Sequence, residues 1–198
     1  MKLNAIKKAC NDQGAFYVFN CQDGRQWLSN GRGAWPVEGI KITESAIPAI
    51  FDLSEKKQNS VSIRAMDYSD KRFTLEPQSD YEIPLEDLGN VWYQGTLYRA
   101  LKNDAGMIFI DTTNLKPAES KEGDFQYFER TAAGRLPLVA CYADFFVSAL
   151  VIVEDQKTAA RIIEYMNKVA REPIRRFSGD GEGETPAGQQ MDMVEGEV

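Results

Sequence analysis

Three aspartates stand where carboxylate chemistry could be placed. Asp67, Asp111 and Asp144 fall near the ends of expected strands, where their side chains could hold two metal ions for phosphoryl transfer. The chain has no histidine, which removes the usual general base, the Ser-His and Cys-His nucleophile pairs and most catalytic zinc sites. Because no two of these aspartates share a motif spacing, we predict that each caps a turn. We expect no catalytic residue, no metal and no cofactor.

Phosphate-binding loops and reactive thiols are not indicated either. The sequence holds no GxxxxGK[ST] motif, and its regularly spaced glycines, at 179–183, lie among acids that repel anions. The three cysteines, Cys10, Cys21 and Cys141, form no close-spaced pair, and without histidine none has the usual activating base. We interpret them as small core residues in a reducing compartment.

Basic residues on expected helices point to a different chemistry, the neutralisation of phosphates. Sequence-independent DNA binding requires cations on exposed faces and needs no base-reading geometry. The alternative is a solvated helix face, because Asp155 and Glu164 are interspersed. The candidate DNA contacts are Lys2, Lys7, Lys8, Arg99, Lys102, Lys157, Arg161 and Lys168.

Aromatic residues in expected strands could add base stacking to these contacts. Trp27, Trp35 and Trp92, the last followed by Tyr93, are candidates on a sheet face. Aromatic residues in strands lie in the core more often than they stack on bases, so a core role is the alternative for each.

The C-terminal tail carries most of the net charge. Residues 179–198 contain six acids and no base, which accounts for six of the seven net negative charges of the chain. The remainder is nearly neutral, so the low isoelectric point neither supports nor excludes a nucleic-acid partner. The composition after Phe177 predicts disorder.

One tail segment suggests a protein partner. Gln190-Met191-Asp192-Met193-Val194 is similar to the clamp-binding peptides of bacterial replication and repair proteins. In such peptides two apolar side chains dock in a pocket while the flanking tail stays flexible. The resemblance implies a replication protein as partner, although Val194 stands where an aromatic residue is commoner and an accidental match is the alternative.

An apolar stretch, Leu136–Val153, is the element on which the other segments depend. It approaches the roughly 20 residues of a membrane-spanning helix, yet Pro137 and Asp144 lie inside it and its Phe and Val residues favour strands. We predict two buried strands, 136–141 and 145–153, joined by a turn at Asp144, and no membrane association. An amphipathic helix follows at 156–171.

Upstream segments predict short helices and antiparallel strands. We expect a helix near residues 43–53 that begins at Ala46 with Ser45 as its cap, a loop at 54–58, and an antiparallel meander over residues 60–85. The segment 97–102 fits a helix or a strand equally well. The remaining expected elements are a helix at 2–10 and strands at 15–21, 26–28, 34–37, 91–94, 106–112 and 125–130.

These elements predict an α+β fold with antiparallel sheets, a long C-terminal helix and a disordered acidic tail. We divide the chain into an N-terminal half (1–88), a C-terminal half (89–173) and the tail (174–198). Asn11–Asn20 resembles Asn103–Asp111, which suggests two similar halves, although short turn–strand sequences also recur by chance. The N-terminus shows no apolar signal segment, so we expect a cytoplasmic location.

The order of elements resembles that of the DNA sliding clamps, including the small two-domain clamps of phages. The resemblance depends on two successive units. The first is the helix 2–10 followed by strands in 15–37, and the second is the helix 43–53 followed by strands in 60–85. The resemblance implies a processivity factor that forms a homo-oligomer around DNA. Three features depart from it: no strand precedes the first helix, Glu44 and Asp52 stand where a clamp has bases, and the last helix is not followed by strands.

The sequence therefore favours a non-enzymatic binding protein, a DNA replication or repair accessory of phage or bacterial origin. A metal-dependent phosphoryl-transfer enzyme that uses Asp111 and Asp144, or a structural assembly protein, are the alternatives.

Overall fold

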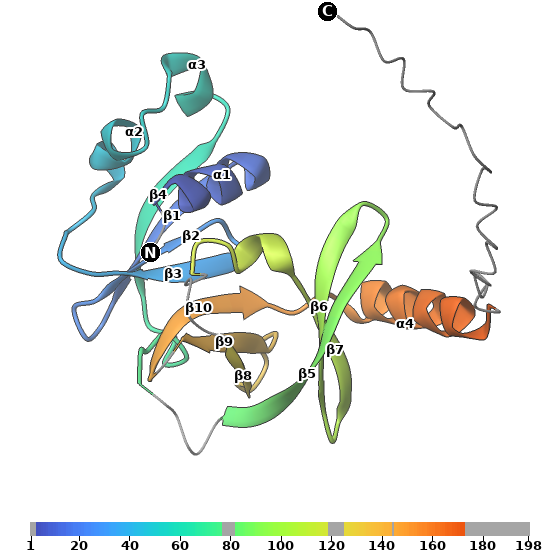
Figure 1. Ribbon diagram of the computed structural model, residues 1–198. Coiled ribbons are helices and arrows are strands. Elements are labelled where there is room, and N and C mark those ends of the chain that lie inside the picture. The colour runs from blue at the N-terminus through green and yellow to red at the C-terminus, as the bar shows by residue number, and fades with distance from the viewer. Residues whose placement is uncertain (1–2, 77–81, 119–124, 144, 173–198) are drawn as a thin grey trace, which may run out of the picture.

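Ten strands form one sheet in a mixed α+β fold, as the sequence predicts (Figure 1). The computed structural model describes residues 3–76, 82–118, 125–143 and 145–172. Along the sheet the strands follow the order β4-β1-β2-β3-β10-β9-β8-β5-β6-β7. Their bounds are β1 Ala15–Cys21, β2 Gln26–Ser29, β3 Gly33–Val37, β4 Ser62–Tyr68, β5 Glu82–Tyr93, β6 Thr96–Asn103, β7 Gly106–Asp111, β8 Gln126–Arg130, β9 Leu138–Ala143 and β10 Phe146–Ile152.

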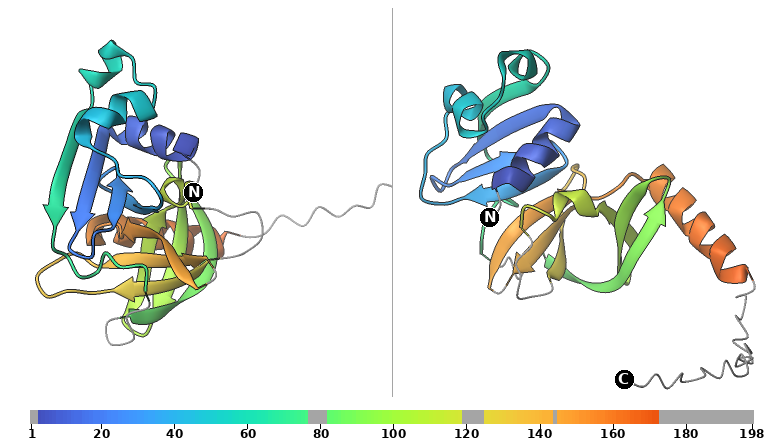
Figure 2. Two further views of the ribbon diagram at one scale, coloured as in Figure 1. Left: turned by 90° about the vertical axis from the view of Figure 1, so that its left-hand side faces the viewer. Right: turned by 45° about the horizontal axis from the view of Figure 1, so that its top comes forward.

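Helices cover limited parts of this sheet. The helix α1 packs Ile6 and Cys10 into the core formed by β1 to β3. The helix α4 carries the strongest amphipathic pattern and lies at the other end of the molecule, against β5, β6 and β7 (Figures 1 and 2). No helix in the described ranges is long and apolar enough to cross a membrane. The helical elements are α1 Leu3–Gln13, η1 Glu44–Ala46, α2 Ile47–Ile50, α3 Glu55–Gln58, η2 Thr112–Asn114 and α4 Gln156–Arg171.

The predicted strand pair in Leu136–Val153 is confirmed as β9 and β10, and it joins the two halves of the chain. In the register of β10 with β3, Leu150 faces Ala34 and Val151 faces Gly33. Gly33 is closely packed there, because an added Cβ would lie 3.0 Å from the Cβ of Asn114, which would have to shift. The predicted boundary at residue 88 lies inside β5, and the sheet runs across it.

A long bent strand curls the C-terminal part of the sheet. The first residues of β5, from Glu82 to Leu85, pair with β8, and the residues from Glu86 onward pair with β6. The register shifts between Asp87 and Gly89, and Gly89 adopts a positive φ of 93°. The curl brings β7 to the end of β10, where the N–H of Glu154 donates to the carbonyl of Phe109 at 2.9 Å.

Alternation along the strands separates two apolar faces. Phe16, Val18 and Leu28 join the larger core under α1, which continues into the inside of the curled part. Trp27 and Tyr142 belong to a second cluster on the opposite face. A non-strand segment, residues 69–76, covers part of that second face, and we call it the crossing segment because it leads from β4 towards β5.

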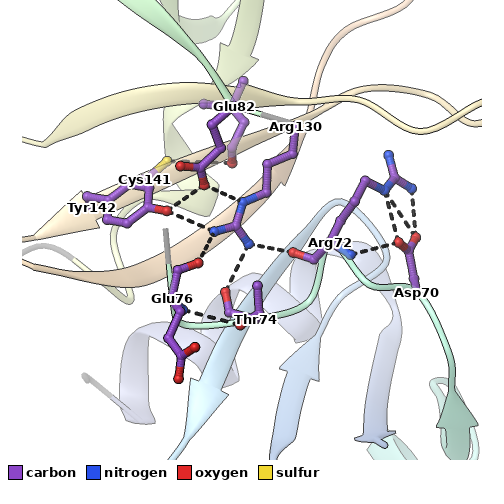
Figure 3. Close-up of polar contacts among 9 residues, drawn as sticks. Asp70, Arg72, Thr74, Glu76, Glu82, Arg130, Cys141 and Tyr142 are labelled. Carbon is purple, nitrogen blue, oxygen red and sulfur yellow. Dashed lines mark hydrogen bonds and ion pairs between the residues drawn. The ribbon is translucent and has the colours of Figure 1, made fainter. Parts of the chain in front are cut away.

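A single buried arginine holds the crossing segment in place (Figure 3). The five N–H groups of Arg130 match five acceptors, because its Nη1 donates to the carbonyls of Arg72 and Thr74 and its Nη2 to the carbonyl of Glu76 and the Tyr142 hydroxyl. Its Nε donates to the Glu82 carboxylate at 2.7 Å. Arg130 is fully buried, and complete pairing is what makes a buried guanidinium tolerable.

Two predictions for residues 60–85 are wrong. The strand β4 does not start an antiparallel meander, because it pairs in parallel with β1, with Ile63 facing Phe16. Residues 72–75 are not a strand, because the carbonyls of Arg72 and Thr74 accept from Arg130. A period-two pattern marks a strand and does not say which neighbour it pairs with.

The short helices also differ from the prediction. The segment 43–53 folds as η1 and α2 only, Ser45 makes no capping bond, and Asp52 ends the segment with a positive φ of 46°. The expected loop at 54–58 contains α3, where Ser54 accepts from the N–H of Lys57. A good cap at Ser54 was sufficient for one helical turn.

Candidate nucleic-acid interface

The predicted cations lie on three separate elements and do not form one surface. Lys7 and Lys8 are on α1, at the opposite end of the molecule from α4 (Figure 2), and Lys2 lies outside the described residues. Arg99 and Lys102 are on β6. Lys157, Arg161 and Lys168 are on α4, and the structure places Arg161 and Lys168 in the lining of one groove.

Two of the predicted cations outside α4, Lys7 and Arg99, contact neighbouring polar groups. Lys7 donates to the carbonyl of Asp52 at 3.2 Å, and Arg99 pairs with Asp87 at 3.2 Å. The Arg99 guanidinium also lies 6.0 Å from the ring centre of Tyr127. Lys102 lies opposite Glu86 in the β5–β6 register. Among these residues Lys8 and Lys102 are exposed and have no hydrogen-bond or ion-pair partner among the described residues.

A groove of about 830 Å³ lies between α4 and the β5–β6 hairpin, and we call it the α4 groove. Lys157 is not in its lining. Arg161 and Lys168 lie in it with Arg171, and Glu164 is the one acid of its lining. In the described part of the chain none of these three cations is ion-paired with a carboxylate. The groove therefore holds a surplus of positive charge that an anion could neutralise.

Two tyrosines lie among these cations. Tyr93, at the end of β5, and Tyr165, on α4, have ring centres 5.5 Å apart, and Tyr165 is 41% exposed. Tyr165 was not predicted as a site residue. Its signal in the sequence is an aromatic residue between Arg161 and Lys168, on a helix whose apolar face is already complete.

The local sequence explains how the groove is held open. Asp155 caps α4 by accepting from the N–H of Thr158 at 2.9 Å, and Ile162 is fully buried against Ala100 and Phe109. Opposite the helix, Gln94 and Gly95 both have positive φ, as a two-residue hairpin turn requires. The tight turn places Tyr93 at the rim of the groove.

The carboxylates considered for catalysis do not gather. Asp111 caps η2 by accepting from the N–H and the hydroxyl of Thr113, and Asp67 lies near Asn20 on the exposed side of β4. Asp144 lies outside the described residues. Within the ranges that the structure describes, no group of three or more Cys, Asp or Glu side chains is placed to hold a metal ion.

The cysteines are placed as core residues. Cys10 and Cys141 are fully buried and Cys21 is half-buried, and all three are free thiols. Burial raises the pKa of Cys10 to about 12 and that of Cys21 to about 11, and it also raises the pKa of Cys141. Thiols with such pKa values are poor nucleophiles at neutral pH.

The tail peptide, residues 190–194, and the expected tail disorder lie outside the described residues. Comparison of the chain with protein-family models, with curated proteins and with solved structures finds no match. The functional argument therefore depends on the geometry of the α4 groove.

Proposed function

We propose that this chain is a non-enzymatic protein that binds nucleic acid without reading its sequence, through the α4 groove. The observation that carries the proposal is the gathering of Arg161, Lys168 and Arg171 beside the rings of Tyr93 and Tyr165. A replication or repair accessory in the cytoplasm is the cellular role that this chemistry fits best.

Phosphates are the anions that suit the α4 groove. Arg161 and Lys168 are seven residues apart, which separates their backbones by about 10 Å along the helix. A row of separated cations matches a polyanion better than a small anion, because each cation can neutralise a different phosphate. Among the described residues that line the groove, no polar side chain is buried, so none forms a fixed donor or acceptor pair that would read a base edge.

The two tyrosines favour single-stranded over double-stranded nucleic acid. A half-exposed ring beside cations can stack on an unpaired base, and such stacking contributes about 1–3 kcal/mol per base. In a duplex the base faces are already stacked, so only the phosphate contacts remain. We therefore expect tighter binding of single strands.

A salt-dependent binding measurement tests the proposal. Fluorescence anisotropy of labelled oligonucleotides, with chelator present, should show binding that weakens steeply between about 50 and about 200 mM salt. The triple variant Arg161→Gln, Lys168→Gln, Arg171→Gln should lose most of that affinity. The control Lys8→Gln, Lys41→Gln, Lys56→Gln removes the same charge outside the groove and should keep it. Equal losses in both variants would reject the α4 groove as the site.

The sliding-clamp form of the proposal makes a stronger claim. A clamp would assemble as a ring of several copies and would stay on circular DNA while it slides off linear DNA. Sedimentation with and without circular DNA tests this form, and a monomer at all concentrations would reject it. The proposed tail contact with a replication protein is tested by removing residues 179–198, which should abolish that contact and leave DNA binding intact.

An assembly role is favoured by a different observation. Phe145 and Phe146, at the turn between β9 and β10, are 83% and 62% exposed, and Trp92 is 61% exposed. Large apolar side chains at this level of exposure are common in surfaces that other proteins cover. If the chain does not bind nucleic acid at low salt and Phe146→Ser prevents self-association, the assembly role replaces the proposed one.

A further inference from the structure

A second concave site lies on the face of the sheet opposite α1, beside the crossing segment. It is a pocket of about 420 Å³, and we call it the arginine pocket. Its floor is apolar and comes from Ala34, Leu138, Leu150 and Ile152 on three adjacent strands. Its volume and largely apolar lining are typical of small-molecule sites.

Two guanidinium groups at the rim share one carboxylate. Arg72 donates to Asp70 from Nε at 3.1 Å and from Nη2 at 2.8 Å, and Arg135 donates to Asp70 Oδ2 at 2.7 Å (Figure 3 shows the Asp70–Arg72 pair). Burial alone would raise the pKa of Asp70, but the hydrogen bonds from Arg72 and Arg135 outweigh it and lower that pKa. Asp70 is therefore ionised at neutral pH.

The arginine pocket has one positive charge that no carboxylate among the described residues balances. Two cations face one anion, and the third arginine of the lining, Arg32, is balanced by Glu154 at 3.3 Å. Arg72 donates to Asp70 and to the carbonyl of Leu136, which leaves one N–H on each of its Nη atoms without a partner among the described residues. The side chain of Arg135 is 51% exposed and can turn toward a ligand.

The walls of the pocket are fixed before any ligand arrives. Arg130 anchors the crossing segment from below through the carbonyls on either side of Phe73. Phe73 packs at 5.5 Å against both Phe19 and Trp27, and Tyr68 stacks on Phe19 at 4.5 Å. A preformed site avoids the entropic loss of ordering its side chains on binding.

We infer that the arginine pocket binds a small carboxylic acid with an apolar body. The carboxylate would lie at Arg72 and Arg135, and the body would cover Leu138, Leu150 and Ile152. The Nε and Nη2 fork of Arg72 is taken by Asp70, but each Nη atom keeps one N–H that can donate to a carboxylate oxygen. A monoanion is favoured over a phosphate because the surplus is a single positive charge. The inference is independent of the nucleic-acid proposal, since the arginine pocket and the α4 groove share no residue.

Calorimetric titration of the full chain with 2-naphthoate tests this inference against naphthalene-2-carboxamide, a neutral molecule of the same shape. We expect saturable binding of the acid and binding at least about tenfold weaker for the amide, as the loss of a charged hydrogen bond implies. Equal affinities, or saturable binding of neither, would overturn the inference.

Matched variants locate the site. Arg135→Gln should weaken 2-naphthoate binding by about tenfold or more, while Arg161→Gln, in the α4 groove, should leave it unchanged. Because Arg135 is half-exposed, the first variant should remain folded, which circular dichroism checks. If both variants bind 2-naphthoate as the unchanged chain does, the arginine pocket is not the site.

A second arm identifies the source of the carboxylate. The peptide Gly-Gly-Gly-Phe with a free C-terminus is compared with its C-terminal amide. Tighter binding of the free peptide than of 2-naphthoate, lost in the amide, would identify a protein C-terminus as the natural ligand. Binding of 2-naphthoate without binding of either peptide would identify a free organic acid.

Discussion

Arg130 and Glu82 form a buried ion pair in which Nε lies 2.7 Å from Oε1, with side chains 0% and 6% exposed. The pair joins β8 to the start of β5, and its arginine also donates to three backbone carbonyls of the crossing segment, those of Arg72, Thr74 and Glu76. Arg130 therefore fixes the second half of the crossing segment, together with one strand contact in which the N–H of Val147 donates to the carbonyl of Leu75 at 3.2 Å.

Removing this arginine should destabilise the fold strongly. Arg130→Met leaves the Glu82 carboxylate buried without its cation, so we expect the free energy of unfolding to fall by about 3–5 kcal/mol. The double variant Arg130→Met, Glu82→Gln should recover part of that loss, because no unpaired charge is left. Urea unfolding of the two variants measures the difference, and equal stabilities would contradict this account of Arg130.

Asp70 should make stability depend on acid pH. Its pKa is lowered in the folded protein from the ordinary value of 3.8, so folding is favoured by its ionised form. This contribution is complete above the unfolded value and is lost as the pH falls through the lower folded value. The stability difference between the unchanged chain and Asp70→Asn should therefore be largest near neutral pH and shrink below about pH 4. A difference that is constant down to about pH 2 would contradict the assignment.

A buried amide network ties the two halves together. Asn30 donates to Asn114 Oδ1 at 3.0 Å, and its own Oδ1 accepts from the N–H groups of Arg32 and Gly33. Asn30→Ala leaves these groups unpaired and should lower the free energy of unfolding by about 1–3 kcal/mol. Asn90→Ala, at an exposed position in β5, is the control and should change it by less than about 0.5 kcal/mol.

Stacking in the α4 groove is testable apart from charge. Tyr165→Ala should weaken single-stranded DNA binding by about 1–3 kcal/mol and duplex binding much less. Phe145→Ala removes a still more exposed ring outside the groove and should change neither. Anisotropy titrations with matched oligonucleotides measure both, and equal loss for single strands and duplex would count against base stacking.

The thiols should resist alkylation in the folded protein. Burial raises the pKa of Cys10 to about 12 and that of Cys21 to about 11, so the thiolate fraction at about pH 8 is very small. Iodoacetamide followed by mass spectrometry should find all three cysteines unmodified in the native chain and modified in urea. Rapid labelling of Cys141 in the native chain would contradict its burial.

Local sequence patterns predicted most helices and strands of this fold, but they could not predict which strands pair with each other. The strand 15–21 and the helix 156–171 were predicted with the observed bounds, because both combine a clear apolar period with a turn or a proline at the end. The parallel pairing of β4 with β1 leaves no local mark, since each strand would alternate in the same way with an antiparallel partner.

Similar short sequences also adopt different secondary structures in the two halves of the chain. Ala5-Ile6-Lys7 lies in α1, whereas Ala100-Leu101-Lys102 lies in β6. The tripeptides that precede the similar segments Asn11–Asn20 and Asn103–Asp111 therefore differ in secondary structure. The surrounding residues decide whether each tripeptide is helix or strand, because the propensity of three residues is weak compared with tertiary packing.

The two sites show the same limit. The cations of α4 could be predicted from helical spacing alone, but the contribution of Tyr93 depends on a hairpin turning back beside the helix. Arg72 and Arg135 escaped prediction because they meet only through Asp70 and the crossing segment. A buried cation in a non-strand segment has no periodic signature.

The pairing of β3 with β10 has a consequence for synthesis on the ribosome. When residues 33–37 emerge, the strand that will cover their open edge has not yet been translated. The nascent N-terminal half must therefore wait with an unpaired strand edge, a surface prone to wrong pairing with other chains. We expect chaperone dependence to end only once residues 146–152 have left the exit tunnel.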